Sequence, residues 1–131
     1  MLKKRIKYTD YNGVEREEDF HFNLTEAELM EMELSEAGGI TAQVEKIIQE
    51  KKQEKIVEIF KDIILKSYGE KSADGKRFIK NDEVRASFEQ NPAYSWLFMK
   101  LATDADAAKK FVKGIVPVVK EEQPNTAPNR K

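Results

Sequence analysis

Two apolar stripes in one long helical segment most constrain what this chain can fold into. The segment begins at Thr41 and runs to Ser67 or Tyr68. Its stripes are Val44, Ile47 and Ile48, and then Ile56, Ile59, Phe60 and Ile63. The polar stretch 49–55 lasts about two turns, and at about 100° per residue the second stripe is rotated by roughly 110° from the first. Because one straight helix cannot turn both stripes toward one core, we predict either a bend within 49–55 or two halves that pack against different bodies.

The second half of this segment carries a further apolar line, formed by Val57 and Ile64 beside Phe60. A helix that is apolar over so much of its circumference is either buried on all sides or in contact with a partner. The sequence leaves both alternatives open, since a small domain on its own exposes little contiguous apolar surface. We therefore treat Val57, Phe60 and Ile64 as candidate partner-binding residues.

The single tryptophan marks a second candidate surface, in the segment PAYSWLFMKLA. The buried face of this helix is expected at positions i, i+3, i+4 and i+7, which are Tyr94, Leu97, Phe98 and Leu101. Trp96 lies roughly 150° or more from the centre of that face, and Met99 lies toward the Trp96 side. Tryptophan is enriched where interfaces concentrate binding energy, so Trp96 and Met99 are candidate partner-binding residues. The alternative is that the hairpin or the long helix covers Trp96.

The first part of the chain predicts a β-hairpin around Asn12-Gly13, the strongest short hairpin signal. A two-residue loop would place apolar residues of one strand on the same face as charged residues of the other. One extra loop residue, with Gly13 left-handed in a G1 bulge, gathers the apolar side chains on one face instead. Those side chains are Ile6, Tyr8, Phe20 and Phe22.

Capping signals delimit shorter helices on both sides of the long segment. Thr25 and Glu28 form a capping box for a helix that Gly38-Gly39 is expected to end. Three further helices are expected to begin at Asn81, at Asn91-Pro92, and at Thr103 with Asp106.

The stretch KSYGEKSADGKRFIKND contains an Asp-Gly pair but does not fit a ligand loop. With Gly75 at the sixth position of a calcium loop, Arg77 falls where an apolar residue is needed and Asn81 replaces the bidentate glutamate. The stretch also lacks the glycine spacing of a phosphate loop. We predict a structural joint instead. Its parts are a left-handed C-cap at Gly69, a turn at Asp74-Gly75, and a return to the core at Phe78-Ile79.

The composition argues against several function classes. The 23 Lys and Arg residues and 24 Asp and Glu residues leave a net charge of -1, which gives no general attraction for nucleic acid. There is no cysteine and His21 is the only histidine, so no metal site, cofactor or Ser-His-Asp triad is expected. No apolar run approaches a membrane span, and the N-terminus lacks a signal-peptide core. We predict a cytosolic protein that is not an enzyme.

Together these patterns predict a mainly α protein with a small N-terminal β-hairpin (α+β), whose helices form a compact bundle of about five. The hairpin would occupy 1–24 and the helical domain 25–117. The polar, proline-containing tail 118–131 is expected to be disordered.

Several short elements between Ile64 and Pro117 form a recognisable series. They are Ser67-Tyr68-Gly69-Glu70, Asp74-Gly75-Lys76-Arg77-Phe78, Ala93-Tyr94, Leu97-Phe98, Phe111-Val112 and Gly114-Ile115-Val116-Pro117. Taken together, they give a sequence that resembles the tail assembly chaperones of long-tailed (siphovirus-type) bacteriophages and related prophages. The resemblance reaches back weakly through the long helix. Trp96 departs from the pattern, since relatives are expected to carry an acidic residue there.

The resemblance implies a non-catalytic assembly factor. Such proteins hold the long, helical, hydrophobic tape measure protein in a soluble state and help the major tail (tube) protein polymerise around it. They then leave, so they are absent from the finished virion, and many are also made as a longer product by translational frameshifting. The implied location is the cytoplasm of a bacterial host. Self-association into dimers or open spirals is a further expectation.

The alternative function class is a small helical regulatory or nucleic-acid-binding protein. Its support is a basic N-terminus, formed by Lys3, Lys4, Arg5 and Lys7. The acidic run from Glu15 to Asp19 would lie across the hairpin from this cluster and neutralise it.

Overall fold

The computed structural model describes residues 1–32 and 39–117, in which six helices pack against a small antiparallel sheet. The strands are β1 (Leu2–Thr9), β2 (Glu15–Phe22), β3 (Tyr68–Lys71) and β4 (Phe78–Ile79). The helices are α1 (Glu26–Glu31), α2 (Gly39–Glu50), α3 (Gln53–Ser67), α4 (Asp82–Glu89), α5 (Pro92–Thr103) and α6 (Ala105–Ile115). None of the helices in these two ranges combines the length and the apolar character that crossing a membrane requires. The expected disorder of 118–131 lies outside the described residues. The helix that follows Thr25 ends at Glu31, before the expected stop at Gly38-Gly39, and Gly39 is the first residue of α2.

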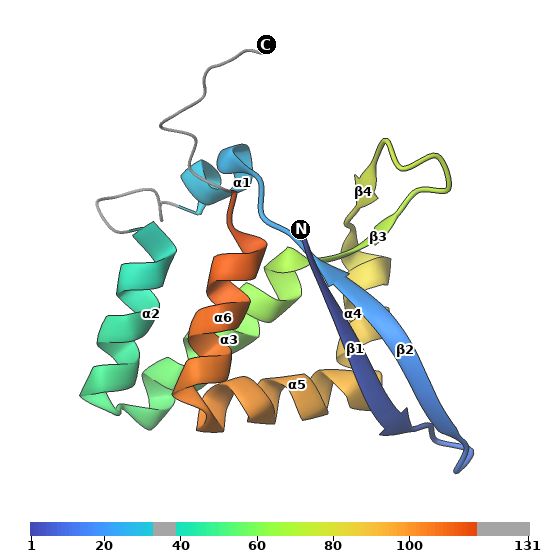
Figure 1. The fold of residues 1–131 in the computed structure, drawn as a ribbon, viewed down its shortest axis with the longest axis horizontal. Coiled ribbons are helices and arrows are strands. Elements are labelled where there is room, and N and C mark those ends of the chain that lie inside the picture. Colours follow the sequence, from blue (N-terminus) through green and yellow to red (C-terminus); the bar gives the residue numbers. More distant parts are fainter. Residues whose placement is uncertain (33–38, 118–131) are drawn as a thin grey trace.

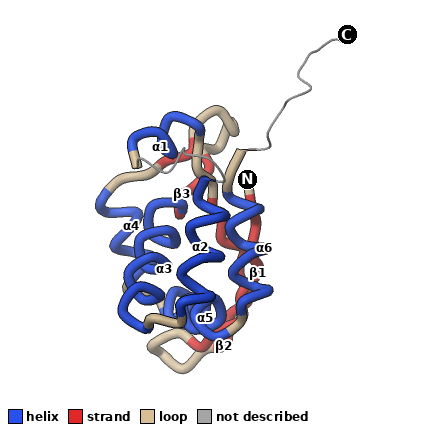
Figure 2. Tube along the Cα trace, turned by 90° about the vertical axis from the view of Figure 1, so that its left-hand side faces the viewer, coloured by secondary structure: helices blue, strands red, loops and turns tan. Residues whose placement is uncertain are grey.

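The predicted α+β class is confirmed, but the sheet is larger than a hairpin. Its four strands follow the order β1-β2-β3-β4, and α5 runs along the foot of the molecule, with α6 rising from one end of it and α2 beside α6 (Figure 1). Turned by 90°, the molecule shows its helices toward the viewer and the hairpin at one edge (Figure 2). The helix count is also corrected from about five to six among the described residues, since the long predicted helix is two helices.

The break in the long segment lies at Lys51, between α2 and α3. Lys51 has a φ of 56°, which lies in the left-handed region and ends α2. Val44 of α2 and Phe60 and Ile63 of α3 are all buried in the same core. The predicted bend within 49–55 is therefore confirmed, and it turns both apolar stripes toward one core.

The predicted hairpin register is confirmed. Gly13 has a φ of 81°, and its N–H donates to the Asp10 carbonyl at 2.9 Å, as the one-residue bulge requires. Ile6 lies opposite Glu18 in the register, and Ile6, Phe20 and Phe22 are buried on one face. This face meets an aromatic cluster in which Tyr68 stacks on Phe88 with ring centroids 4.3 Å apart.

Two expected helix ends are corrected. Gly69 does not have a positive φ and lies inside β3, because the chain leaves α3 directly into a strand. A Cβ at Gly69 would lie 2.7 Å from the Phe78 ring, so close strand packing explains this glycine. The cap of α6 is Asp104 rather than Thr103, since Asp104 accepts from the Ala107 N–H at 3.1 Å and Thr103 is the last residue of α5. The caps at Thr25, Asn81 and Asn91 are confirmed.

Candidate partner-binding surfaces

The five candidate partner-binding residues divide between the core and the surface. Phe60 and Ile64 are 1% and 0% exposed. Val57, Trp96 and Met99 are 45%, 45% and 54% exposed. As folded here, only the last three can be reached by another protein.

Val57 and Ile64 differ in exposure because they lie at different positions along the axis of α3, not because they lie on different sides of it. The two residues lie on nearly the same side of the helix, because seven residues make about two turns. The C-terminal half of α3 is covered by α4, whose Arg85 Nε donates to the Leu65 carbonyl at 3.3 Å. Val57 lies nearer the N-terminal end of α3, away from this contact with α4, and stays exposed.

The outer face of α5 presents Trp96 and Met99 together. They are three residues apart and therefore neighbours on the helix surface. Leu97 and Leu101 on the other side of α5 are 0% and 2% exposed, and Tyr94 and Phe98 are partly buried against the core, so the predicted face is the one turned inward. We call Trp96 and Met99 the α5 patch.

A groove between α2 and α3 was not anticipated from the sequence. It has a volume of about 410 Å³ and receives Ile47 from α2, Ile59 and Ile63 from α3, and Met32 from the end of α1. Lys55, Glu58, Asp62 and Lys66 of α3 provide a charged rim. The groove exists because the break at Lys51 folds α2 back beside α3. In the sequence, the polar stretch 49–55 indicates a bend, but it does not indicate which side chains of the two helices would line a groove.

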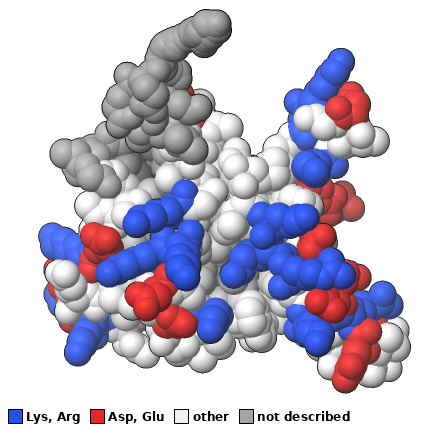
Figure 3. Space-filling view, in the orientation of Figure 1, with Lys and Arg blue, Asp and Glu red and all other residues white. Residues whose placement is uncertain are grey.

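The predicted neutralisation of the basic N-terminus is confirmed in part, at Arg5, whereas Lys3 and Lys4 lie opposite His21 and Phe20 rather than the acidic run. Arg5 lies 3.0 Å from Asp19 and 3.1 Å from Glu17, and its hydrogen bonds to these two carboxylates raise the pKa of its guanidinium. Figure 3 shows Lys and Arg mixed with Asp and Glu across this face of the molecule. The arrangement offers no uniformly basic surface for a phosphate backbone there.

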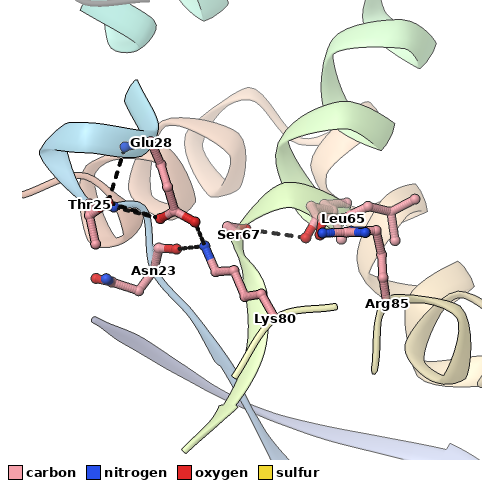
Figure 4. Close-up of polar contacts among 8 residues, drawn as sticks. Asn23, Thr25, Glu28, Leu65, Ser67, Lys80 and Arg85 are labelled. Atoms are coloured by element: carbon pink, nitrogen blue, oxygen red, sulfur yellow. Dashed lines mark hydrogen bonds and ion pairs between the residues drawn. The ribbon is translucent and has the colours of Figure 1, made fainter. Parts of the chain in front are cut away.

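A polar junction ties α1 to the strands. Lys80 Nζ donates to Glu28 Oε2 and to the Asn23 carbonyl, both at 2.7 Å (Figure 4). Glu28 also accepts from the Thr25 N–H at 2.8 Å, so one carboxylate serves both the capping box and the ion pair. Burial lowers the pKa of Lys80, although its bond to Glu28 acts against this shift. Burial acts to raise the pKa of Glu28, but the hydrogen bonds from Lys80 and Thr25 outweigh it and lower this pKa.

The titratable groups assemble no metal site in the two described ranges, where no three His, Cys, Asp or Glu side chains are placed to hold an ion. His21 lies in β2 opposite Gly69, and burial together with the charge of Lys71 lowers its pKa. In the loop between β3 and β4, Asp74 accepts from Ser72 Oγ at 2.6 Å and from the Lys76 N–H at 3.0 Å. These bonds make Asp74 part of a turn, in which Gly75 has a φ of 75°.

Comparison with known proteins identifies the family. A family model described as phage tail assembly chaperone matches residues 1–129. No curated protein and no solved structure matches the chain significantly. The match spans nearly the whole sequence, including the N-terminal hairpin. The chain therefore belongs to the phage tail assembly chaperone family.

Proposed function

We propose that this chaperone binds the tape measure protein of a long-tailed phage, keeps it soluble, and promotes assembly of the tail tube around it. The observation that carries the proposal is that, on a member of this family, Val57 and the α5 patch are apolar side chains left accessible on helices. Isolated monomers gain nothing from exposing a tryptophan and a neighbouring methionine on one helix face. A partner with apolar helix faces would cover them.

The α2–α3 groove supports an amphipathic helix as the recognised element. An apolar floor with charged rims is the form of site into which one helix lays its apolar face. Met32 on the floor and Met99 on α5 are flexible side chains that adapt to changing partner sequences. A long helical client offers many such apolar faces, none of which has to match perfectly.

The rest of the proposal concerns the assembly pathway. The chaperone acts in the bacterial host cytoplasm without catalysis, contacts the major tail (tube) protein as well as the tape measure protein, and is absent from the mature virion. Self-association through the same apolar surfaces would protect them until the client is made.

Coexpression with the tape measure protein of the same phage tests the proposal. We expect the client to be soluble with the unaltered chaperone and to precipitate with Val57→Asp or with Trp96→Asp/Met99→Asp. Ala73→Asp is the matched control, because it adds the same charge at an exposed position in the β3–β4 loop, outside both surfaces. If the client stays equally soluble with folded Val57→Asp and α5-patch variants, the proposed surfaces are wrong.

A further inference from the structure

The outer edge of β2 is open over most of its length. β2 pairs with β3 through Phe22 and His21, where His21 lies opposite Gly69. In the other direction along β2, toward the hairpin tip, the described part of the chain places no strand beside it. Figure 1 shows β3 and β4 projecting away from the lower part of β2.

The main-chain groups of Asp19 and Glu17 face this open edge. Alternate residues of an antiparallel strand turn their N–H and C=O groups to the same side. His21 turns these groups toward β3, and the Asn23 N–H donates to the Ser67 carbonyl at 2.8 Å on that side. Counting back by two residues gives Asp19 and then Glu17. Their amides are therefore available to an added strand, while β1 occupies the opposite edge of β2.

The space beside this edge is large enough for extended chain. A cleft of about 610 Å³ lies between β2 and β3. Phe20 and Tyr68 form its apolar part. Its charged lining is Glu17, Glu18, Asp19 and Glu70 together with Arg5 and Lys71, so four carboxylates face two basic groups and leave an excess of two negative charges. An added strand would alternate its side chains between the inner, partly apolar side and the outer side that carries Glu17 and Asp19.

Arg5 already pairs with Glu17 and Asp19, so the net negative charge that remains along the cleft selects its occupant. A second copy of β2 would bring Glu17 and Asp19 opposite carboxylates, and like charges directly opposite one another destabilise a strand pair. The basic strand β1 of a second copy is flanked by its own helices, since Leu2 and Lys4 share a cavity with Asp106 and Lys110 of α6. An extended segment of another protein that carries lysine or arginine at alternate positions would meet neither the repulsion between carboxylates nor the flanking helices.

We propose that the β2 edge from Glu17 to Asp19 binds a basic, extended segment of a partner protein as an added strand. Main-chain hydrogen bonds would supply the attachment, and the acidic side chains would supply the preference for a basic sequence. This surface is separate from Val57 and the α5 patch, so the inference does not depend on the proposed function.

A synthetic peptide with the sequence of β1, LKKRIKYT, with acetylated and amidated ends, is a suitable probe because β1 already pairs with β2 in this chain. Amide hydrogen exchange of the full-length protein is measured by NMR with and without the peptide. We expect exchange at Glu17 and Asp19 to slow at least tenfold, with little change at the amides of β1. Unchanged exchange at Glu17 and Asp19 with saturating peptide would overturn the proposal.

Backbone-methylated peptide separates strand addition from charge attraction without altering the protein. Methylation at alternate amides keeps every charge but removes donors for main-chain bonds, so we expect at least tenfold weaker binding. Equal binding of both peptides would mean that only surface charge attracts them, and would overturn the inference.

Substitutions at Glu17 test the edge from the protein side. Glu17→Pro removes the outward N–H, whereas Glu17→Ala removes only the carboxylate and serves as its control. We expect the proline variant to bind the peptide at least tenfold more weakly than the alanine variant. If the unaltered protein forms dimers in sedimentation experiments and Glu17→Pro abolishes them, the occupant is a second copy, which contradicts the proposed partner.

Discussion

Lys80 Nζ lies 2.7 Å from Glu28 Oε2, although the two residues are 52 positions apart in the chain. The pair joins the residue after β4 to α1, a helix that has no fully buried residue of its own. The Lys80 side chain is only 12% exposed, so removing either partner leaves the other poorly solvated. The junction therefore holds α1 on the body of the molecule.

Replacement of Lys80 by methionine should lower the free energy of unfolding. The substitution keeps the aliphatic stem but removes two charge-assisted bonds, and we expect a loss of about 1–3 kcal/mol in urea denaturation. Lys66→Met is the control, because its ion pair with Asp62 is about half exposed on both sides. That variant should change stability by less than about 0.5 kcal/mol. Equal losses in the two variants would contradict a special role for the junction.

The ion pair also predicts a pH dependence. The folded-state pKa of Glu28 is lowered from its ordinary value of 4.5, so its stabilisation is fully present above that value. It is lost as the pH falls below 4.5 through the folded-state pKa. Glu28→Gln should therefore be clearly less stable than the unaltered protein at pH 7, and the difference should shrink at pH 3. Urea denaturation at both values measures it, and a difference that does not change with pH would contradict the assignment.

Gly69 tests whether close packing or a left-handed backbone explains this glycine. A Cβ would lie 2.7 Å from the Phe78 ring and 2.9 Å from the Ile79 carbonyl, so Gly69→Ala should cost about 1–3 kcal/mol. Gly69→Asn should be at least as harmful, although asparagine tolerates a left-handed backbone. Gly75→Asn is the control, since Gly75 has a positive φ and open space around its Cα. We expect Gly75→Asn to be tolerated. If Gly69→Asn is tolerated equally well, Gly69 has a left-handed backbone and the C-cap interpretation is correct.

These residues also show which parts of the structure could be predicted from sequence. The capping box at Thr25 and the bulge at Gly13 were predicted because each depends on a few adjacent residues. Gly69 was misinterpreted because a glycine after a helix looks the same whether it serves a left-handed cap or a close contact. The strands β3 and β4 were missed because their pairing, not their short sequences, defines them.

The same limit applies to the candidate surfaces. Helical periodicity placed Val57 and Ile64 on one side of a helix, but it does not report which end another helix covers. Trp96 was correctly placed opposite the buried face of α5, because that inference needs only the spacing within one helix. The α2–α3 groove joins residues from three helical segments and could not be inferred from any one of them.

Lys51 offers a test of the break between α2 and α3. A lysine with a φ of 56° is strained by roughly 1 kcal/mol or more, and glycine adopts this backbone freely. Lys51→Gly should therefore leave the melting temperature unchanged or raise it, whereas β-branched Lys51→Val should lower it. If the helix were continuous through Lys51, Lys51→Gly would instead lower the free energy of unfolding by about 1 kcal/mol. Thermal unfolding followed by circular dichroism distinguishes the two.

Trp96 provides an optical test of the α5 patch, because it is the only tryptophan in the chain. Trp96 is 45% exposed, so the tryptophan fluorescence of the dilute protein should lie at long wavelength and be quenched efficiently by acrylamide. Addition of the tape measure protein should move the emission to shorter wavelength and reduce quenching as the indole is covered. Met99→Asp should weaken this response, because Met99 lies beside Trp96 on α5, while Ala73→Asp should leave it unchanged. Emission that is already at short wavelength and shielded at the lowest protein concentration would place Trp96 in a covered environment and remove it from the binding surface.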